Sequence, residues 1–191
     1  MLIGVTGNFA CGKSAFMHTV STFGFDVFYA DEMVKKIYKD EIIIKTIGRE
    51  FGKSIIFNSQ VDKDLLTLIV FNDKEKLNRL NTLIHPLIIK KIKEIKHKKK
   101  IVFVEVPLLF EAKMEELFNK IILVKCTKKT AKKRALKKGY GAGEFEKIIS
   151  SQDIPELKIS KSDYVIDSEG IISKTRKQAI EIIEKLKGEL K

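Results

Sequence analysis

Residues 7–14 read GNFACGKS, which matches the pattern G-x-x-x-x-G-K-[ST] of a phosphate-binding loop. The apolar segment LIGVTG (2–7) leads into it and an amphipathic segment follows Lys13, so the motif lies between a predicted buried strand and a predicted helix. Its glycines allow successive backbone N–H groups to turn inward around phosphate oxygens, and the helix adds the positive end of its dipole. In this context the motif predicts that the chain binds a nucleoside triphosphate.

Individual residues of the loop have separate expected roles. Lys13 is expected to reach the β- and γ-phosphates, and the hydroxyl of Ser14 to ligate Mg²⁺. Cys11 occupies a free position, where it is either a filler or a thiol made reactive by the helix N-terminus. The residues of this segment expected to bind ATP are Gly7, Ala10, Cys11, Gly12, Lys13, Ser14 and Ala15.

The composition is that of one globular chain without membrane segments. It has 191 residues, of which 44% are hydrophobic, and no apolar run reaches the ~18 residues of a membrane helix. We see no signal peptide, and Cys11 and Cys126 are far apart and in no metal-ligand spacing. These features predict a reduced, cytoplasmic protein without a membrane partner, and a monomer or weak homo-oligomer is expected.

The chain is strongly basic, with 37 basic against 25 acidic residues and a net charge of +12. Such a charge attracts either nucleic acid or polyanionic small molecules, unless it forms only a solvated lysine-rich surface. The lysines are spread along predicted helices, without interleaved aromatic residues or a recognised nucleic-acid module. We therefore expect no nucleic-acid partner.

The opening of the chain reads as strand, glycine-rich loop, helix and strand, with the second strand at FDVFYAD (25–31). This order predicts a βαβ unit and a parallel sheet. The sequence that follows predicts helices. Asp62 is placed to cap one helix, and either Asn72 or Asp73 is placed to cap the next. Pro86 is expected to break the pattern and begin another helix.

The sheet resumes after this helical block. IVFVEVP, KIILVKC and SDYVIDS read as strands, and a long amphipathic helix closes the chain. The expected fold is therefore α/β, a P-loop NTPase three-layer fold with a parallel five-stranded sheet. We assign residues 1–31, 101–130 and 160–191 to the nucleotide-binding core, 32–100 to a helical substrate-domain insertion and 131–152 to a lid.

Asp31 stands at the end of the second strand, which we expect beside the strand that carries the loop. A kinase needs a carboxylate at this edge to orient an acceptor hydroxyl and take its proton. The alternative is that Asp31 caps a helix starting at Glu32, which does not exclude catalysis.

Two further segments suit a kinase. In EVPLLFE (105–111), the apolar residues after Pro107 either pack against a substrate or form a hydrophobic plug, and Glu111 is a candidate for the metal or acceptor side. Arg134, on the lysine-rich helix, is a candidate for neutralising the transferred phosphoryl group. The glycines at 139, 141 and 143 suit the hinges of a lid that excludes water, unless this helix is only a solvated face.

In their order along the chain, these motifs resemble those of dephospho-CoA kinases, which finish coenzyme A biosynthesis. The resemblance covers nearly the whole chain, and its specific elements are HP and PLLFE in combination with the phosphate-binding loop. The matching segments are VTGNFACGKS (5–14), YAD (29–31), FG (51–52), VDKDLLTLIVF (61–71), LNTLIHPLI (80–88), VPLLFE (106–111), the region of Arg134, Gln152 and DYVID (163–167).

The resemblance implies a phosphotransferase that uses ATP and Mg²⁺ to phosphorylate the 3′-hydroxyl of the ribose in dephospho-CoA. It implies that Asp31, Lys13 and Arg134 are catalytic, with Arg134 also binding ATP. The acceptor site is implied to comprise Asp31, His85, Pro107, Leu108 and Glu111.

The chain departs from the family pattern at several positions. Tyr29 replaces the first of two aspartates, which favours Asp31 as the base. Lys138 replaces a second arginine of the lid, and because lysine lacks the planar fork of arginine, stabilisation of the transferred phosphoryl group is expected to rest more on Arg134. The other departures are Ala15 for threonine, Lys63 for arginine, Ala131 for glutamine and Ser168 for asparagine.

Two other functions stay open at this point. One is a sister P-loop kinase that acts on a nucleotide or another small alcohol. The other is a nucleic-acid-stimulated ATPase that uses the basic surface.

Overall fold

The computed structural model describes residues 1–71, 73–96, 101–152 and 155–189, and in it the chain divides into two compact units. One unit comprises Met1–Tyr29 and Ile95–Lys191, and the other comprises Ala30–Glu94. The first contains β1 (Leu2–Thr6), α1 (Lys13–Thr22), β2 (Asp26–Tyr29), β5 (Val102–Glu105), the 3₁₀-helix η2 (Glu115–Leu117), β6 (Lys120–Lys125), α6 (Lys128–Lys137), α7 (Ala142–Ser150), α8 (Pro155–Ser160), β7 (Tyr164–Asp167) and α9 (Ile172–Gly188).

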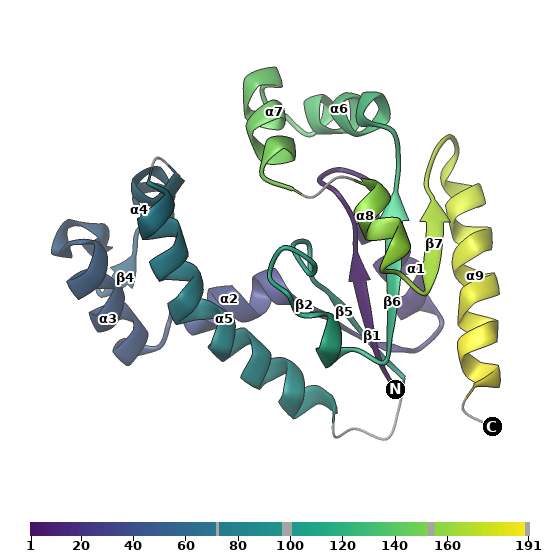
Figure 1. Cartoon of the computed structure of the whole chain (residues 1–191), viewed down its shortest axis with the longest axis horizontal. Helices are drawn as coiled ribbons and strands as arrows, with labels where there is room; N and C mark the ends of the chain where they lie inside the picture. Colours follow the sequence, from purple (N-terminus) through teal and green to yellow (C-terminus); the bar gives the residue numbers. More distant parts are fainter. Residues whose placement is uncertain (72, 97–100, 153–154, 190–191) are drawn as a thin grey trace. The chain divides into compact units, whose positions relative to one another are not determined.

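The first unit is built on a parallel five-stranded sheet, as the sequence predicts, in the order β2-β5-β1-β6-β7 (Figure 1). One expectation about this order is wrong. We expected β2 beside β1, but β5 pairs with both of them and lies between. The chain leaves the sheet after β2 for the inserted block, and β5 then returns between β2 and β1, so strands that are neighbours in sequence are not neighbours in the sheet.

The two faces of the sheet are covered by different segments. On one face, α1 and α9 pack against alternate strand residues, with Phe16 of α1 and Ile183 of α9 fully buried. On the other face, an ideal Cβ added to Gly4 would lie 2.8 Å from Leu109 and 2.9 Å from Phe118. The segment after β5 therefore packs directly onto the backbone of the central strand.

The second unit contains α2 (Ala30–Ile37), α3 (Glu41–Phe51), the 3₁₀-helix η1 (Lys53–Ile55), β3 (Ile56–Phe57), β4 (Gln60–Val61), α4 (Lys63–Phe71) and most of α5 (Lys74–Lys96). The carboxylates of Asp62 and Asp73 accept backbone N–H bonds at the starts of α4 and α5, as predicted; Asn72, the alternative cap, lies outside the described residues. The antiparallel hairpin β3–β4 was not expected in a helical insertion.

The predicted helix break at Pro86 is also wrong, because Pro86 lies inside α5, a single helix of 23 residues. An interior proline removes one backbone hydrogen bond and costs about 3 kcal/mol. Pro86 is exposed, whereas Ile84, Ile88 and Ile92 form a buried stripe at helical spacing. Apolar burial along this stripe outweighs the lost bond. Within the described residues, no helix is both long enough and apolar enough to cross a membrane.

The close packing at Gly4 predicts that Gly4→Ala lowers the free energy of unfolding by about 1–3 kcal/mol, because Leu109 and Phe118 must move. Urea unfolding measures this change. Gly188→Ala is the matched control, since an added Cβ there meets open space and is expected to be neutral or slightly stabilising. Equal stability of Gly4→Ala and the parent would contradict the packing described.

Candidate active site

The phosphate-binding loop is shaped by a close approach between neighbouring strands. Gly7 has φ 149°, and an ideal Cβ at this position would lie 2.1 Å from the carbonyl oxygen of Val124 on β6, so no side chain fits. Gly12, directly before α1, has the left-handed φ of 95°. Ala10 is also left-handed, with φ 58°, a conformation that costs a non-glycine residue about 1–2 kcal/mol. The loop therefore holds a strained, inward-turned backbone of the kind that cradles phosphate.

Lys13 and Ser14 follow this backbone in the first turn of α1. The Lys13 side chain is buried, and its ammonium donates to the carbonyl oxygens of Gly7 at 2.8 Å and Asn8 at 3.2 Å. Ser14 is exposed. The described residues include no group of three His, Cys, Asp or Glu side chains able to hold a metal. An exposed serine hydroxyl is an oxygen ligand of the kind that Mg²⁺ takes, so Ser14 fits a Mg²⁺ site that phosphate oxygens would complete.

Arg134, of α6, lies against the other side of the loop. Its guanidinium donates to the hydroxyl of Ser168 at 3.0 Å and to the carbonyl oxygen of the same residue at 2.6 Å. The Ser168 hydroxyl in turn donates to the carbonyl oxygen of Cys11 at 2.6 Å, and the guanidinium is 3.6 Å from an ideal Cβ on Gly12. The fold thus brings Arg134 to the phosphate-binding loop, and Ser168 is the link between them.

Cys11 packs beneath the loop. Its side chain is buried, and its Sγ is 3.9 Å from the carbonyl oxygen of Cys126. A hydrogen bond from the Cys126 thiol holds the pKa of Cys11 below its usual value, with smaller contributions from Lys13 and Arg134, while the same contact raises the pKa of Cys126. The thiol is part of an apolar cluster, which agrees with its interpretation as a filler of the loop.

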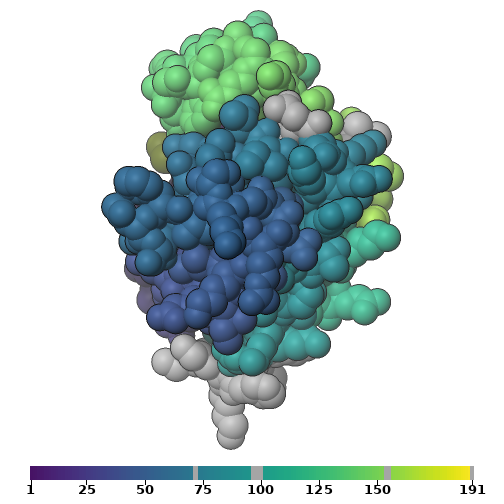
Figure 2. Space-filling view, turned by 90° about the vertical axis from the view of Figure 1, so that its left-hand side faces the viewer, coloured from purple at the N-terminus to yellow at the C-terminus, as the bar shows by residue number. Residues whose placement is uncertain are grey.

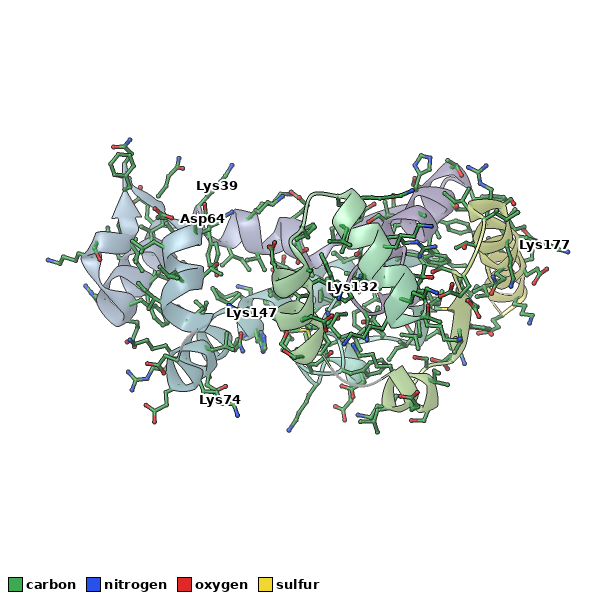
Figure 3. All side chains as sticks on the ribbon, turned by 90° about the horizontal axis from the view of Figure 1, so that it is seen from above. Lys39, Asp64, Lys74, Lys132, Lys147 and Lys177 are labelled. Atoms are coloured by element: carbon green, nitrogen blue, oxygen red, sulfur yellow. The ribbon has the colours of Figure 1, made fainter. Side chains whose placement is uncertain are left out.

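The helices α6 and α7, expected to form a lid, pack on this loop. The ring of Phe9 makes an edge-on contact with Tyr140 at 4.9 Å between centroids. Glu146 of α7 forms ion pairs with Lys128 at 2.7 Å and Lys132 at 3.0 Å on α6 (Lys132 is labelled in Figure 3). The two helices form one compact body, drawn in green in Figure 2.

The glycines expected as lid hinges have different environments. Gly139 follows α6 with φ 91°, and Gly141 precedes α7. Gly143 is the second residue of α7, so only Gly139 and Gly141 lie between the two helices.

The apolar residues after Pro107 were expected either to pack against a substrate or to form a hydrophobic plug, and their burial differs from residue to residue. Leu109 and Phe110 are buried, as in a hydrophobic plug, whereas Leu108 is 44% exposed. The carbonyl oxygen of Pro107 accepts a bond from the Thr6 hydroxyl at 3.3 Å, which ties this segment to the end of β1.

One contact of Glu111 involves a residue that sequence reasoning missed. Its carboxylate pairs at 2.7 Å with Lys158 of α8, whose ammonium also contacts the Asn8 side chain at 2.7 Å. Nothing local distinguishes Lys158 in a chain with 37 basic residues. Gln152, part of the family resemblance, accepts a bond from the backbone N–H of Phe9 at 2.9 Å.

Asp31 and His85 belong to the second unit. Asp31 is the second residue of α2, two positions after the end of β2, and its side chain is exposed. Because α2 begins at Ala30, the interpretation of Asp31 as the cap of a helix starting at Glu32 is wrong. His85 is half-buried in the middle of α5, and burial lowers its pKa. It is therefore a neutral hydrogen-bonding group at pH 7 rather than a charge for a phosphate.

The lysines of the surface come from many elements. Lys39 follows α2, Lys74 is the first residue of α5, and Lys177 lies on α9. Each of these side chains projects outward from the ribbon (Figure 3).

Comparisons with known proteins relate the whole chain to one family. The family model described as dephospho-CoA kinase matches residues 1–174. A dephospho-CoA kinase of Fusobacterium nucleatum is 38% identical over 172 residues, covering 88% of this chain and 89% of that protein. One of Bartonella quintana is 35% identical over 191 residues, covering 97% of each chain. The solved structure of a dephospho-CoA kinase from Campylobacter jejuni has a TM-score of 0.74 at 27% identity, with 98% of each chain covered.

The bonds of Ser168 predict that Ser168→Ala weakens binding of a non-hydrolysable ATP analogue about tenfold, because Arg134 and the loop carbonyl of Cys11 lose the hydroxyl that they share, and Arg134 keeps only its bond to the backbone carbonyl of residue 168. Titration calorimetry measures the affinity. Ser21→Ala is the control, since its exposed hydroxyl bonds only within α1 to His18 in the described contacts. An unchanged affinity in Ser168→Ala would show that this link does not position the donor site.

Proposed function

Because the chain belongs to the dephospho-CoA kinase family and is a phosphotransferase with an alcohol acceptor, we propose that it uses ATP and Mg²⁺ to phosphorylate the 3′-hydroxyl of dephospho-CoA, with Asp31, Lys13 and Arg134 as the catalytic residues. The observation that carries the donor half of this proposal is the convergence of Lys13 and Arg134 on one strained loop. Gly7 and Gly12 shape the backbone that would hold the triphosphate, and the remaining loop residues Ala10, Cys11, Ser14 and Ala15 complete it.

The acceptor half rests on different residues. Asp31 is an exposed carboxylate two positions after β2, in the first turn of α2, which suits a group that must meet a substrate hydroxyl. Leu108 offers exposed apolar surface after β5, and Pro107 and Glu111 flank it. His85 would contribute a neutral hydrogen-bonding imidazole.

In the proposed reaction, the Asp31 carboxylate accepts the proton of the 3′-hydroxyl as its oxygen attacks the γ-phosphorus. The bond between the γ-phosphorus and the bridging oxygen breaks, and ADP departs with the electron pair. Lys13 and Arg134 stabilise the charge on the transferred phosphoryl group, which is the main way that proteins accelerate this chemistry. Bound Mg²⁺, with Ser14 as its protein ligand, would neutralise phosphate charge. Closure of residues 131–152 would exclude water, which otherwise competes as acceptor.

If Asp31 is the base, Asp31→Asn lowers dephospho-CoA-stimulated ADP formation about 10²–10⁴-fold, because the amide cannot accept the proton. Binding of an ATP analogue is expected to change little. A coupled assay for ADP, run with and without dephospho-CoA, measures the first effect, and calorimetry the second.

Glu32→Gln is the control for this experiment, since Glu32 is the adjacent carboxylate and pairs with Lys35 at 2.6 Å on the surface. Full activity in Asp31→Asn would sink the assignment of the base. A panel of other alcohols and nucleotides tests the acceptor: if the parent chain turns over one of them and not dephospho-CoA, it is a sister kinase. Stimulation by DNA or RNA instead would indicate a nucleic-acid-dependent ATPase.

A further inference from the structure

The described part of the chain buries two charged side chains, and both contact the phosphate-binding loop. Lys13 is 8% exposed and belongs to the loop motif itself. Lys158 is 1% exposed, lies on the short helix α8, and has no place in that motif. Burying an ammonium carries a large desolvation cost, which persists only where the partners are well placed.

The partners of Lys158 come from two different segments. Its Nζ donates to Oδ1 of Asn8, inside the phosphate-binding loop, at 2.7 Å. The same atom pairs at 2.7 Å with Oε1 of Glu111, whose side chain is 16% exposed. Asn8 is therefore held twice: Lys13 contacts its backbone carbonyl oxygen, and Lys158 contacts its side chain.

A buried ion pair is weak evidence for stability, because apolar residues of similar volume often stabilise a core equally well. An ion pair of this kind can instead fix positions, because a lysine ammonium has three donors and can hold two oxygen atoms at hydrogen-bond distance. Here the two oxygens belong to the donor loop and to the segment after β5. The ammonium is thus a tie between the segment expected to hold ATP and the segment expected to line the acceptor.

We propose that Lys158 is a positioning residue, which fixes Glu111 and the loop residue Asn8 relative to one another so that acceptor and donor meet in reactive geometry. This inference rests on the proposed function for the roles of the two segments. Loss of Lys158 releases the Glu111 carboxylate and the Asn8 side chain, whereas Lys13 still holds the backbone carbonyl oxygen of Asn8, so the acceptor side is disturbed more than the affinity for ATP.

The experiment compares Lys158→Met, Lys158→Gln and Lys158→Arg with the parent chain. Lys158→Met is expected to lower kcat/KM for dephospho-CoA about 10–100-fold, since small misplacements at a reacting centre cost about this much. The KM for ATP is expected to change less than about threefold, because the backbone N–H groups that would bind the phosphates are retained. Lys158→Arg keeps the charge and is expected to restore most of the activity. Lys158→Gln retains a donor for Asn8 but not the charge for Glu111, and it serves if Lys158→Met does not fold.

Two further comparisons distinguish positioning from a general structural role. Glu111→Gln is expected to reproduce the loss, and the double variant Glu111→Gln with Lys158→Gln to be no worse than either single change, because both act through one contact. Lys161→Met, on the turn that follows α8, is the matched control, since Lys161 pairs at 3.2 Å with Glu115 and is half exposed. Full acceptor turnover in Lys158→Gln, or additive losses in the double variant, would overturn the proposal.

Amide hydrogen exchange provides a readout independent of the substrate. Lys158→Gln is expected to speed exchange in residues 8–12 and in residues 107–114 together, whereas Lys161→Met, which loses contacts with Phe110 and Glu115, leaves residues 8–12 unchanged. If dephospho-CoA proves not to be the acceptor but the paired exchange effect appears, the proposed function fails and the tie through Lys158 stands. Unchanged exchange in both segments would refute the tie itself.

Discussion

The backbone of residue 7 passes so close to the carbonyl oxygen of Val124 that no side chain fits between them, and the arrangement of the site depends on this contact. It forces the chain out of β1 and over the carboxyl end of the sheet, where Gly12 turns it into α1. The ammonium of Lys13 then falls on the carbonyl oxygens of the same loop. A steric constraint between two neighbouring strands thereby decides where positive groups gather, and so where an anion binds.

Around this loop, polar contacts join distant segments in addition to the apolar cluster that contains Cys11 and Ala131. Ser168 joins α6 to the carbonyl oxygen of Cys11, Gln152 joins the end of α7 to Phe9, and Lys158 joins α8 to Asn8. Each tie ends on the loop, and each comes from the C-terminal third of the chain. Hydrogen bonds of this kind have strict directional requirements, so they fix the loop more closely than apolar packing does.

The sequence predicted the parts of the fold that carry a local signal. β1, the loop and α1 follow from a motif and a change of hydrophobic period, and Asp62 from its place before an apolar helix. The hairpin β3–β4 has strands of two residues, too short to show a period. The position of β5 between β1 and β2 depends on pairing across the inserted unit, and the contacts of Lys158 span about 150 residues of sequence, as its bond to Asn8 shows. Neither the strand order nor the contacts of Lys158 can be predicted from a short stretch of sequence.

One departure of this chain from the family pattern, Ala131, is explained by packing. Ala131, in a position where glutamine is common, is fully buried against Cys11 with Ala135 one turn later. A longer polar side chain there would need both space and a partner. Because two alanines face the loop, α6 approaches it closely, and Arg134, between them in sequence, is brought to within 3.6 Å of an ideal Cβ on Gly12. The two buried alanines and Arg134 thus lie on the part of α6 that is packed against the loop.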